Sequence, residues 1–227
     1  MPDIKKLLED FTKQADLNKS ATSLIPFRSP SPMRSLFSGN EIADNMLGKL
    51  YRTVTSSRIS HAVLDQHTAI AWDMDDTLIN GPQSWFWRRW IQSNHANRKF
   101  CILTYRTAHI DSVWQELEQC TDPVSPEWFQ SVIAIPKILW SEWSSFPSLL
   151  REIDTEEKMT PILIDYVRSK YSYLNIRYMI EVNRAVRSWK AVECKQRGYS
   201  LLVEDREQFC KPYCDLLKIK FLNALTG

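Results

Sequence analysis

The sequence predicts an α/β fold in which a Rossmann-like parallel sheet carries helices on both faces. Four short apolar runs lie at 68–73, 99–104, 131–135 and 200–204. Stretches with helical spacing alternate with them, at 83–95, 107–119, 188–197 and 206–224. This alternation is typical of parallel sheets, because parallel neighbours need a long crossover, usually a helix. Ligands of such sheets collect at the carboxyl ends of the strands, so the residues that close each run are the first candidates for function.

Composition sets broad limits on the class of protein. The chain has 227 residues, 44% of them apolar, which suffices for one substantial core. A net charge of +2 gives no broad electrostatic footprint for nucleic acid or an anionic membrane. No apolar run reaches the length of a membrane span. Five cysteines without a CxxC pair favour a reduced, cytoplasmic location over a disulfide framework.

Domain organisation is expected to change near residues 38 and 66. Residues 1–38 combine an amphipathic helical pattern with a linker rich in serine and proline, and residues 39–66 regain helical periodicity. The remaining residues, 67–227, carry the α/β pattern. We therefore expect one domain with an N-terminal helical extension, and residues 1–38 are a candidate site for a protein partner.

The first apolar run ends in two closely spaced carboxylates. The sequence I-A-W-D-M-D-D-T-L places Asp73 and Asp75 two positions apart at the predicted strand end. Side chains alternate along extended backbone, so these two can lie on one side of the strand tip unless the chain has begun to turn. Paired acids in such a place suit a divalent cation and one covalent or acid–base step.

The second run ends in a hydroxyl. Thr104 closes the apolar residues 100–103 and precedes a predicted helix. A hydroxyl and the free N–H groups of a helix start both donate toward an anion, which makes this a candidate phosphate site. Arg106, two residues later, is a candidate contact for a substrate phosphate. Taken alone, Thr104 is better explained as a strand-end or capping residue, and the phosphate site depends on the other residues nearby.

The last run ends in a second pair of acids. A helical pattern ends at Gly198, a residue suited to a left-handed cap, and a short strand then leads into Glu204 and Asp205. Lys190 stands fourteen positions before Glu204 (204 − 190) and could balance the acids, with Lys195 as the nearby competitor. The alternative is a lysine that faces water and two acids that merely begin a turn.

Together these residues resemble the motifs of the haloacid-dehalogenase-like (HAD) hydrolase superfamily. The elements, in order, are Asp73-x-Asp75-x-Thr77, Thr104, Lys190 and Glu204-Asp205. The resemblance covers roughly residues 66–217. Its fourth motif is the form with adjacent acids, since Phe209 occupies the position where the other form has its second acid.

The resemblance implies a Mg²⁺-dependent phosphatase. Asp73 would attack a phosphoryl group and form an aspartyl-phosphate, while Asp75 would protonate the leaving oxygen and later activate water. The implied binding residues are, for the phosphoryl group, Thr104 and Lys190, and, for Mg²⁺, the Asp73 carboxylate, the Asp75 backbone carbonyl and Asp205, with Glu204 as a further candidate. The presence of Asp75 favours phosphoester over carbon–halogen chemistry.

Spacing predicts where an insertion lies. Only thirty-one positions separate Asp73 from Thr104 (104 − 73), too few for a large inserted cap. Eighty-six separate Thr104 from Lys190 (190 − 104), more than one strand and two helices need. We therefore expect an insertion of several tens of residues within 121–187, including a helix at 156–170, that partly covers the site.

The substrate is left open between a small phosphorylated molecule and a nucleotide or nucleic-acid end. Aromatic residues could stack bases while Arg88 and Arg89 contact phosphates, although an aromatic stripe is more often part of a core. These aromatic residues are Trp85, Phe86, Trp87 and Trp90 and, within the expected insertion, Trp140 and Trp143. A third interpretation is a HAD-like interaction protein without catalysis. The sequence favours the phosphatase.

Overall fold

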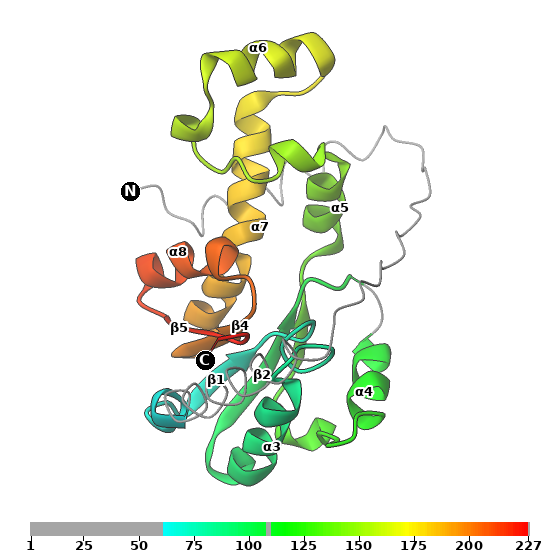
Figure 1. Cartoon of the computed structure of the whole chain (residues 1–227), viewed down its shortest axis with the longest axis vertical. Helices are drawn as coiled ribbons and strands as arrows, with labels where there is room; N and C mark the ends of the chain where they lie inside the picture. Colours follow the sequence, from blue (N-terminus) through cyan, green and yellow to red (C-terminus); the bar gives the residue numbers. More distant parts are fainter. Residues whose placement is uncertain (1–60, 108–109, 227) are drawn as a thin grey trace, which may run out of the picture.

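The computed structural model describes residues 61–107 and 110–226, which form a five-stranded, all-parallel sheet in the order β3-β2-β1-β4-β5 (Figure 1). The strands are β1 (Ala69–Trp72), β2 (Lys99–Thr104), β3 (Val132–Ala134), β4 (Leu201–Glu204) and β5 (Lys220–Asn223). In register, Ala71 of β1 pairs with Cys101 of β2 and with Leu202 of β4. The predicted α/β class with a parallel sheet is thus confirmed. The predicted segments at 1–38 and 39–60 lie outside the described residues.

Helices cover both faces of this sheet. They are α3 (Ser84–Asn94), α4 (Ile110–Glu118), α5 (Lys137–Ser145), α6 (Pro161–Lys170), α7 (Ile176–Arg197) and α8 (Glu207–Leu217). Side chains point alternately to the two faces along β1. Ile70 and Trp72 therefore pack in one apolar cluster with α3 and α4, and Ala71 packs in another with α5, α7 and α8. Both faces of the central strand are therefore buried, which explains why its sequence is an unbroken apolar run. No helix of the described residues is long and apolar enough to cross a membrane.

The chain end departs from the prediction of one helix at 206–224. Helix α8 ends at Leu217, Lys218 adopts a left-handed conformation with φ 59°, and β5 follows as an edge strand. The N–H of Lys218 donates to the carbonyl of Asp215 at 3.2 Å, so the helix end is satisfied. The helical prediction for 218–224 is wrong, because the turn is made by a lysine rather than by the glycine that usually marks such an end.

Helix α7 is longer than its predicted core at 188–197. The Asn175 side chain caps its start by accepting the N–H of Tyr178 at 3.2 Å, and Gly198, with φ 76°, ends it as predicted. The helix predicted at 156–170 begins only at Pro161, after the capping residue Thr160. Figure 1 shows α6 and the start of α7 extending away from the sheet, with α5 beside α7.

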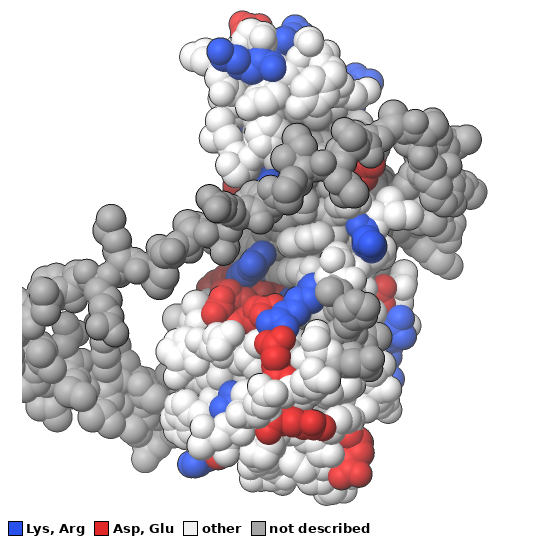
Figure 2. Space-filling view, turned by 90° about the vertical axis from the view of Figure 1, so that its right-hand side faces the viewer, with Lys and Arg blue, Asp and Glu red and all other residues white. Residues whose placement is uncertain are grey.

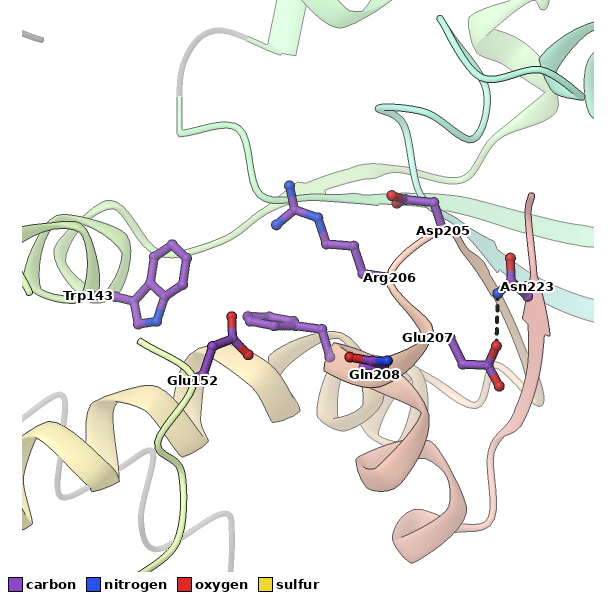
Figure 3. Close-up of a pocket in the computed structure, with 8 residues that line it drawn as sticks. Trp143, Glu152, Asp205, Arg206, Glu207, Gln208 and Asn223 are labelled. Carbon is purple, nitrogen blue, oxygen red and sulfur yellow. Dashed lines mark hydrogen bonds between the residues drawn. The ribbon is translucent and has the colours of Figure 1, made fainter. Parts of the chain in front are cut away.

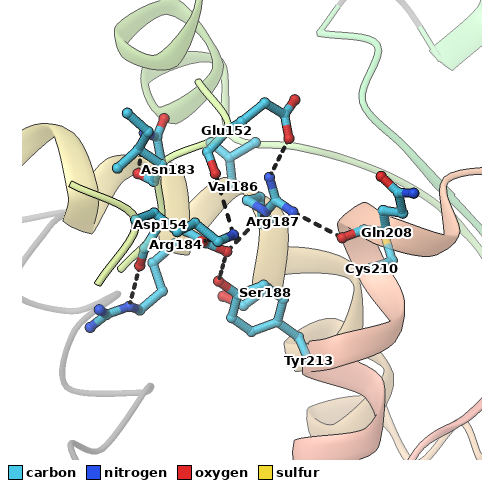
Figure 4. Close-up of polar contacts among 12 residues, drawn as sticks. Glu152, Asp154, Asn183, Arg184, Val186, Arg187, Ser188, Gln208, Cys210 and Tyr213 are labelled. Carbon is cyan, nitrogen blue, oxygen red and sulfur yellow. Dashed lines mark hydrogen bonds and ion pairs between the residues drawn. The ribbon is translucent and has the colours of Figure 1, made fainter. Parts of the chain in front are cut away.

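A buried polar network ties this helical region to the rest of the molecule (Figure 4). Arg187 of α7 is 4% exposed, lies 3.1 Å from an Asp154 oxygen, and donates to Glu152 at 2.7 Å and to the carbonyl of Gln208 at 2.9 Å. The Tyr213 hydroxyl of α8 donates to Asp154 at 2.7 Å. Segment 152–154, α7 and α8 are therefore fixed to one another by one buried guanidinium.

We predict that Arg187→Met lowers the free energy of unfolding at pH 7 by about 3 kcal/mol, because it leaves the buried Asp154 carboxylate short of its partner. Chemical denaturation measures this loss. The matched control is Arg197→Met, whose exposed pair with Glu193 is expected to contribute less than about 1 kcal/mol. Equal losses in the two variants would contradict the assigned role of Arg187.

The loss of unfolding free energy in Arg187→Met is expected to depend on pH. Burial alone would raise the pKa of Asp154, but Lys158, Tyr213 and Arg187 outweigh burial and lower it. A lowered pKa contributes stability above the unfolded value of about 3.9, and this stability is lost as pH falls through the folded value. The difference between wild type and Arg187→Met should therefore be complete at pH 7 and shrink below about pH 4.

The loop after β1 is folded back tightly. The N–H groups of Leu78 and Ile79 both donate to the carbonyl of Met74, at 2.9 and 3.0 Å, and Asp76 takes a φ of 57°. A Cβ added at Gly81 would lie 2.0 Å from the carbonyl oxygen of Asp76, which no side chain can occupy. Glycine is required at 81 by this close approach of backbone to backbone.

We predict that Gly81→Ala lowers the free energy of unfolding by about 3 kcal/mol, since backbone must move to admit the methyl group. Gly198→Ala is the control, because a Cβ there contacts nothing within 4 Å and the cost is that of the left-handed φ, about 1–2 kcal/mol. The comparison is made by denaturant titration of both variants. A smaller loss at 81 than at 198 would show that the loop relaxes freely.

Candidate functional site

Three adjacent strands deliver the predicted site residues to one edge of the sheet. Asp73 follows β1, Thr104 ends β2 and Glu204 ends β4, with Asp205 next in the chain. Strand β1 lies between β2 and β4, and the three strands are parallel, so their carboxyl ends meet. The crossing helix α7 brings Lys190 to the same place, although it is 117 positions from Asp73.

Lys190 is the centre of this arrangement. It is fully buried, and its ammonium donates to Asp73 Oδ1 and to Glu204 Oε2. The same nitrogen lies 4.4 Å from the centroid of the Tyr105 ring, a cation–π contact. Burial alone would lower the pKa of Lys190, but the two carboxylates outweigh burial and raise it, so the ammonium stays charged. Of the two candidate lysines it is Lys190 that meets the acids, while Lys195 is exposed.

The site holds three acidic side chains and only one buried lysine, Lys190. Carboxylate oxygens of Asp73, Glu204 and Asp205 all lie within 4.8 Å of one another. Burial, with Glu204 next, raises the pKa of Asp73 to about 7 despite Lys190. Burial also raises the pKa values of Glu204 and Asp205. Three acids facing one ammonium leave an excess of negative charge in a mostly buried space, and such an all-oxygen donor set suits Mg²⁺.

Two of the three acids have oxygens left for a cation. Both oxygens of Glu204 are engaged, Oε2 by Lys190 and Oε1 by the N–H of Arg206 at 3.3 Å. Asp73 gives only Oδ1 to Lys190, and Asp205 forms no ion pair with any residue that the structure describes. Asp73 and Asp205 are therefore the side chains best placed to hold a divalent cation, while Glu204 holds the lysine.

Asp75 does not belong to this cluster. The chain has turned by Asp75, whose side chain is 43% exposed and is bound by Arg106 through Nε, at 2.9 and 3.1 Å, and through Nη2, at 2.5 Å. Glu116 of α4 holds the same guanidinium at 2.5 and 3.1 Å. The predicted substrate contact Arg106 is thus engaged by two carboxylates. Sequence reasoning missed Glu116, which no motif marks.

The two predicted threonines are buried close to the site. The hydroxyl oxygen of Thr104, 1% exposed, accepts the N–H of Arg106 at 3.1 Å, which is the local strand-end role considered for it. Its hydroxyl hydrogen remains able to donate. The Thr77 hydroxyl is fully buried and has no hydrogen-bond partner among the described residues.

The aromatic residues of α3 form core rather than a stacking surface. Trp87 is fully buried, Trp90 is 3% exposed, and both rings lie about 6 Å from that of Trp72 in β1. Trp85 alone of this group is exposed, at 45%. These rings support the fold and do not reach the acids at the strand ends.

A cleft of about 600 Å³ opens beside Asp205 (Figure 3). It is lined by Trp143, Glu152, Asp205, Arg206, Glu207, Gln208, Phe209 and Asn223. Acidic and basic side chains gather in the hollow between the insertion helices and the sheet (Figure 2). Apart from Asp205 and the candidate stacking residue Trp143, sequence reasoning missed these residues. Only Arg206, directly after the acidic pair, carried a signal that could have been used.

Comparison of the sequence with models of known protein families and with curated protein sequences found no match. The resemblance to HAD hydrolases therefore depends on the motifs and on where the fold places them.

Proposed function

We propose that this protein is a Mg²⁺-dependent phosphatase of the HAD type that hydrolyses a small phosphomonoester. One observation carries the proposal. A fully buried ammonium, Lys190, bridges Asp73 and Glu204 at the ends of neighbouring parallel strands, with Asp205 beside them. A structural ion pair needs one acid, whereas a site for phosphoryl transfer needs a nucleophile, an anion-binding cation and a metal ligand in contact.

Asp73 is the nucleophile in this proposal. Its carboxylate oxygen forms a bond to phosphorus while the bond from phosphorus to the leaving oxygen breaks, which gives an aspartyl-phosphate and an alcohol. Water then attacks phosphorus and releases inorganic phosphate and the free Asp73 carboxylate. Lys190 offsets the negative charge of the transferring group, and the Thr104 hydroxyl donates to it. A bound Mg²⁺, held by Asp73 and Asp205, would supply further charge neutralisation to the phosphoryl oxygens.

Asp75 is the proton carrier of the proposal. It gives a proton to the leaving oxygen and takes one from the attacking water in the second step. In the described arrangement its carboxylate is bound by Arg106. Proton transfer to a substrate therefore requires this ion pair to loosen, and Glu116 can keep the guanidinium paired when Asp75 leaves.

The test of the proposal is the variant Asp73→Asn. We expect it to lose more than about 10³-fold of the rate of phosphate release from 4-nitrophenyl phosphate with Mg²⁺, because an amide cannot act as the nucleophile. Asp165→Asn, an exposed acid of α6, serves as the control and should retain the wild-type rate. Full activity in Asp73→Asn refutes the nucleophile assignment. No phosphoester hydrolysis by wild type favours the non-catalytic interpretation.

Metal binding has its own test. Mg²⁺ at about 100 times its dissociation constant should stabilise the wild-type protein by about 2.7 kcal/mol, measured as a rise in Tm. We expect Asp205→Asn to abolish this rise, because the Asp205 carboxylate belongs to the acidic cluster and forms no ion pair with a described lysine or arginine. Asp76→Asn is the control, an exposed acid in a left-handed conformation that asparagine tolerates. A rise that survives in Asp205→Asn would exclude Asp205 as a ligand.

The role of Asp75 predicts a dependence on the leaving group. In single turnovers, Asp75→Asn should slow release of an alkyl alcohol by about 10²–10⁴-fold. Release of 4-nitrophenolate should be slowed much less, since that leaving group needs no proton. Rapid-quench measurement of both products in the same variant makes the comparison internal. Equal slowing of the two esters would show that Asp75 does not protonate the leaving oxygen.

A further inference from the structure

We propose that the cleft beside Asp205 binds a second anionic group of the substrate through Arg206, so that the preferred substrates are phosphomonoesters that also carry a carboxylate or a second phosphate. This inference rests on the phosphatase function proposed above. It adds a residue that determines specificity and a class of substrate to that function.

The position of the cleft makes it the place for the organic part of a substrate. Asp205 belongs to the acidic cluster and also lines the cleft, while Trp143 and Glu152 line it from the helical insertion. A phosphoryl group held next to Asp73 therefore has its ester substituent directed toward this space. A volume of about 600 Å³ lies within the range of small-molecule sites, about 300–1,000 Å³.

Arg206 is the only lysine or arginine among the residues that line the cleft. Figure 3 shows its side chain reaching over the cleft between Asp205 and Trp143. Its guanidinium has no carboxylate within 4.0 Å among the described residues, in contrast to Arg106 and Arg187. Its nearest described aromatic partner is the Tyr105 ring, 5.8 Å from its carbon centre.

Two of the three acids that line the cleft, Glu152 and Glu207, are already paired. Glu152 accepts from Arg187 at 2.7 Å, and Glu207 accepts from Lys211 at 2.8 Å and from Asn223 at 2.9 Å. These two acids have partners of their own and form no ion pair with Arg206, while Glu204, Asp205 and Asp73 act on its guanidinium only from beyond ion-pair distance. A guanidinium is always charged and its planar fork matches a carboxylate or a phosphate, so a second anion of the substrate is the ligand it suits.

The far wall of the cleft is formed by Trp143. Trp143 is 8% exposed, packs edge-on against Phe209 with ring centroids 6.1 Å apart, and has an indole N–H with no acceptor among the described residues. The indole nitrogen itself has almost no exposed surface, so Trp143 contributes an apolar wall to the cleft and Arg206 alone carries the preference for an anion.

The experiment compares three matched three-carbon phosphomonoesters, in which the far carbon carries a hydroxyl, a carboxylate or a second phosphate. Wild type should hydrolyse at least one of the two doubly anionic esters with a kcat/KM about 10-fold to 100-fold above that of the hydroxyl ester, mainly through KM. Arg206→Gln should bring this ratio to about 1. Because each variant is its own reference, a general loss of activity does not affect the ratio.

Arg168→Gln is the matched control, since it removes an exposed arginine of α6 that does not line the cleft and should keep the wild-type ratio. The carboxylate and bisphosphate esters show which anion the cleft prefers. A ratio near 1 in wild type, or a ratio in Arg206→Gln equal to that of wild type, overturns the proposal.

A separate binding measurement tests the anion site if the protein hydrolyses no phosphate ester. If no ester is hydrolysed, that function is refuted, and calorimetry with the unreactive three-carbon phosphonates decides the binding proposal. Tighter binding of the carboxylated phosphonate that is lost in Arg206→Gln supports an anion site. Equal binding of the carboxylated and hydroxyl phosphonates overturns it.

Discussion

The structure depends on one buried ammonium that two carboxylates share. Lys190 has no exposed surface, so its charge has lost water and is compensated only by Asp73, Glu204 and the Tyr105 ring. Taking these charges out of water costs several kcal/mol per ion, and the mutual attraction recovers this only when the geometry is close. Helix α7 must therefore cross the sheet where β1 and β4 end. The ion pair therefore limits where α7 can cross the sheet more than it adds to the free energy of unfolding.

An excess of negative charge follows from that constraint. Burial is the main reason that the pKa values of Asp73, Glu204 and Asp205 are raised, and for each of them a neighbouring acid of the cluster raises the pKa further. The protein could have removed the excess by replacing Asp205 with an apolar residue. Asp205 is partly buried next to two buried acids, and keeping a third acid in this place agrees with the cation site proposed above.

Sequence reasoning reached the parts of the fold that local patterns specify. Four strands and the cap at Gly198 follow from apolar runs and helix-end signals. The choice between Lys190 and Lys195 stayed open in the sequence, and the packing of α7 decided it. Strand β5 was not predicted, because the helical periodicity of the sequence continues past Leu217. The left-handed turn falls on Lys218, and lysine is not a residue type that marks such a turn. Tertiary contacts decided that turn, and local preferences did not.

The remaining site residues were unpredictable for a different reason. Arg106 and Glu116 meet because α4 folds back over the loop after β2, and ion pairs across such a distance follow from packing rather than from spacing. The same holds for Arg187 and Asp154, 33 positions apart (187 − 154). The sequence identifies residues that must sit at strand ends, while their partners depend on which helix faces they meet.

Residues from α5 and from the segment that follows β4 both line the cleft. Trp143 belongs to α5, and Arg206 lies in the segment that follows β4. The width of the cleft therefore depends on the position of α5 relative to α7 and α8. That relation is held by Arg187, which contacts Glu152 at the cleft and Gln208 at the start of α8. A rigid buried network next to the cleft fixes its walls before a ligand arrives, and a preorganised site loses less entropy on binding. In the proposed function, α5 would contribute to specificity through the fixed position of Trp143 and not through a contact with the acids.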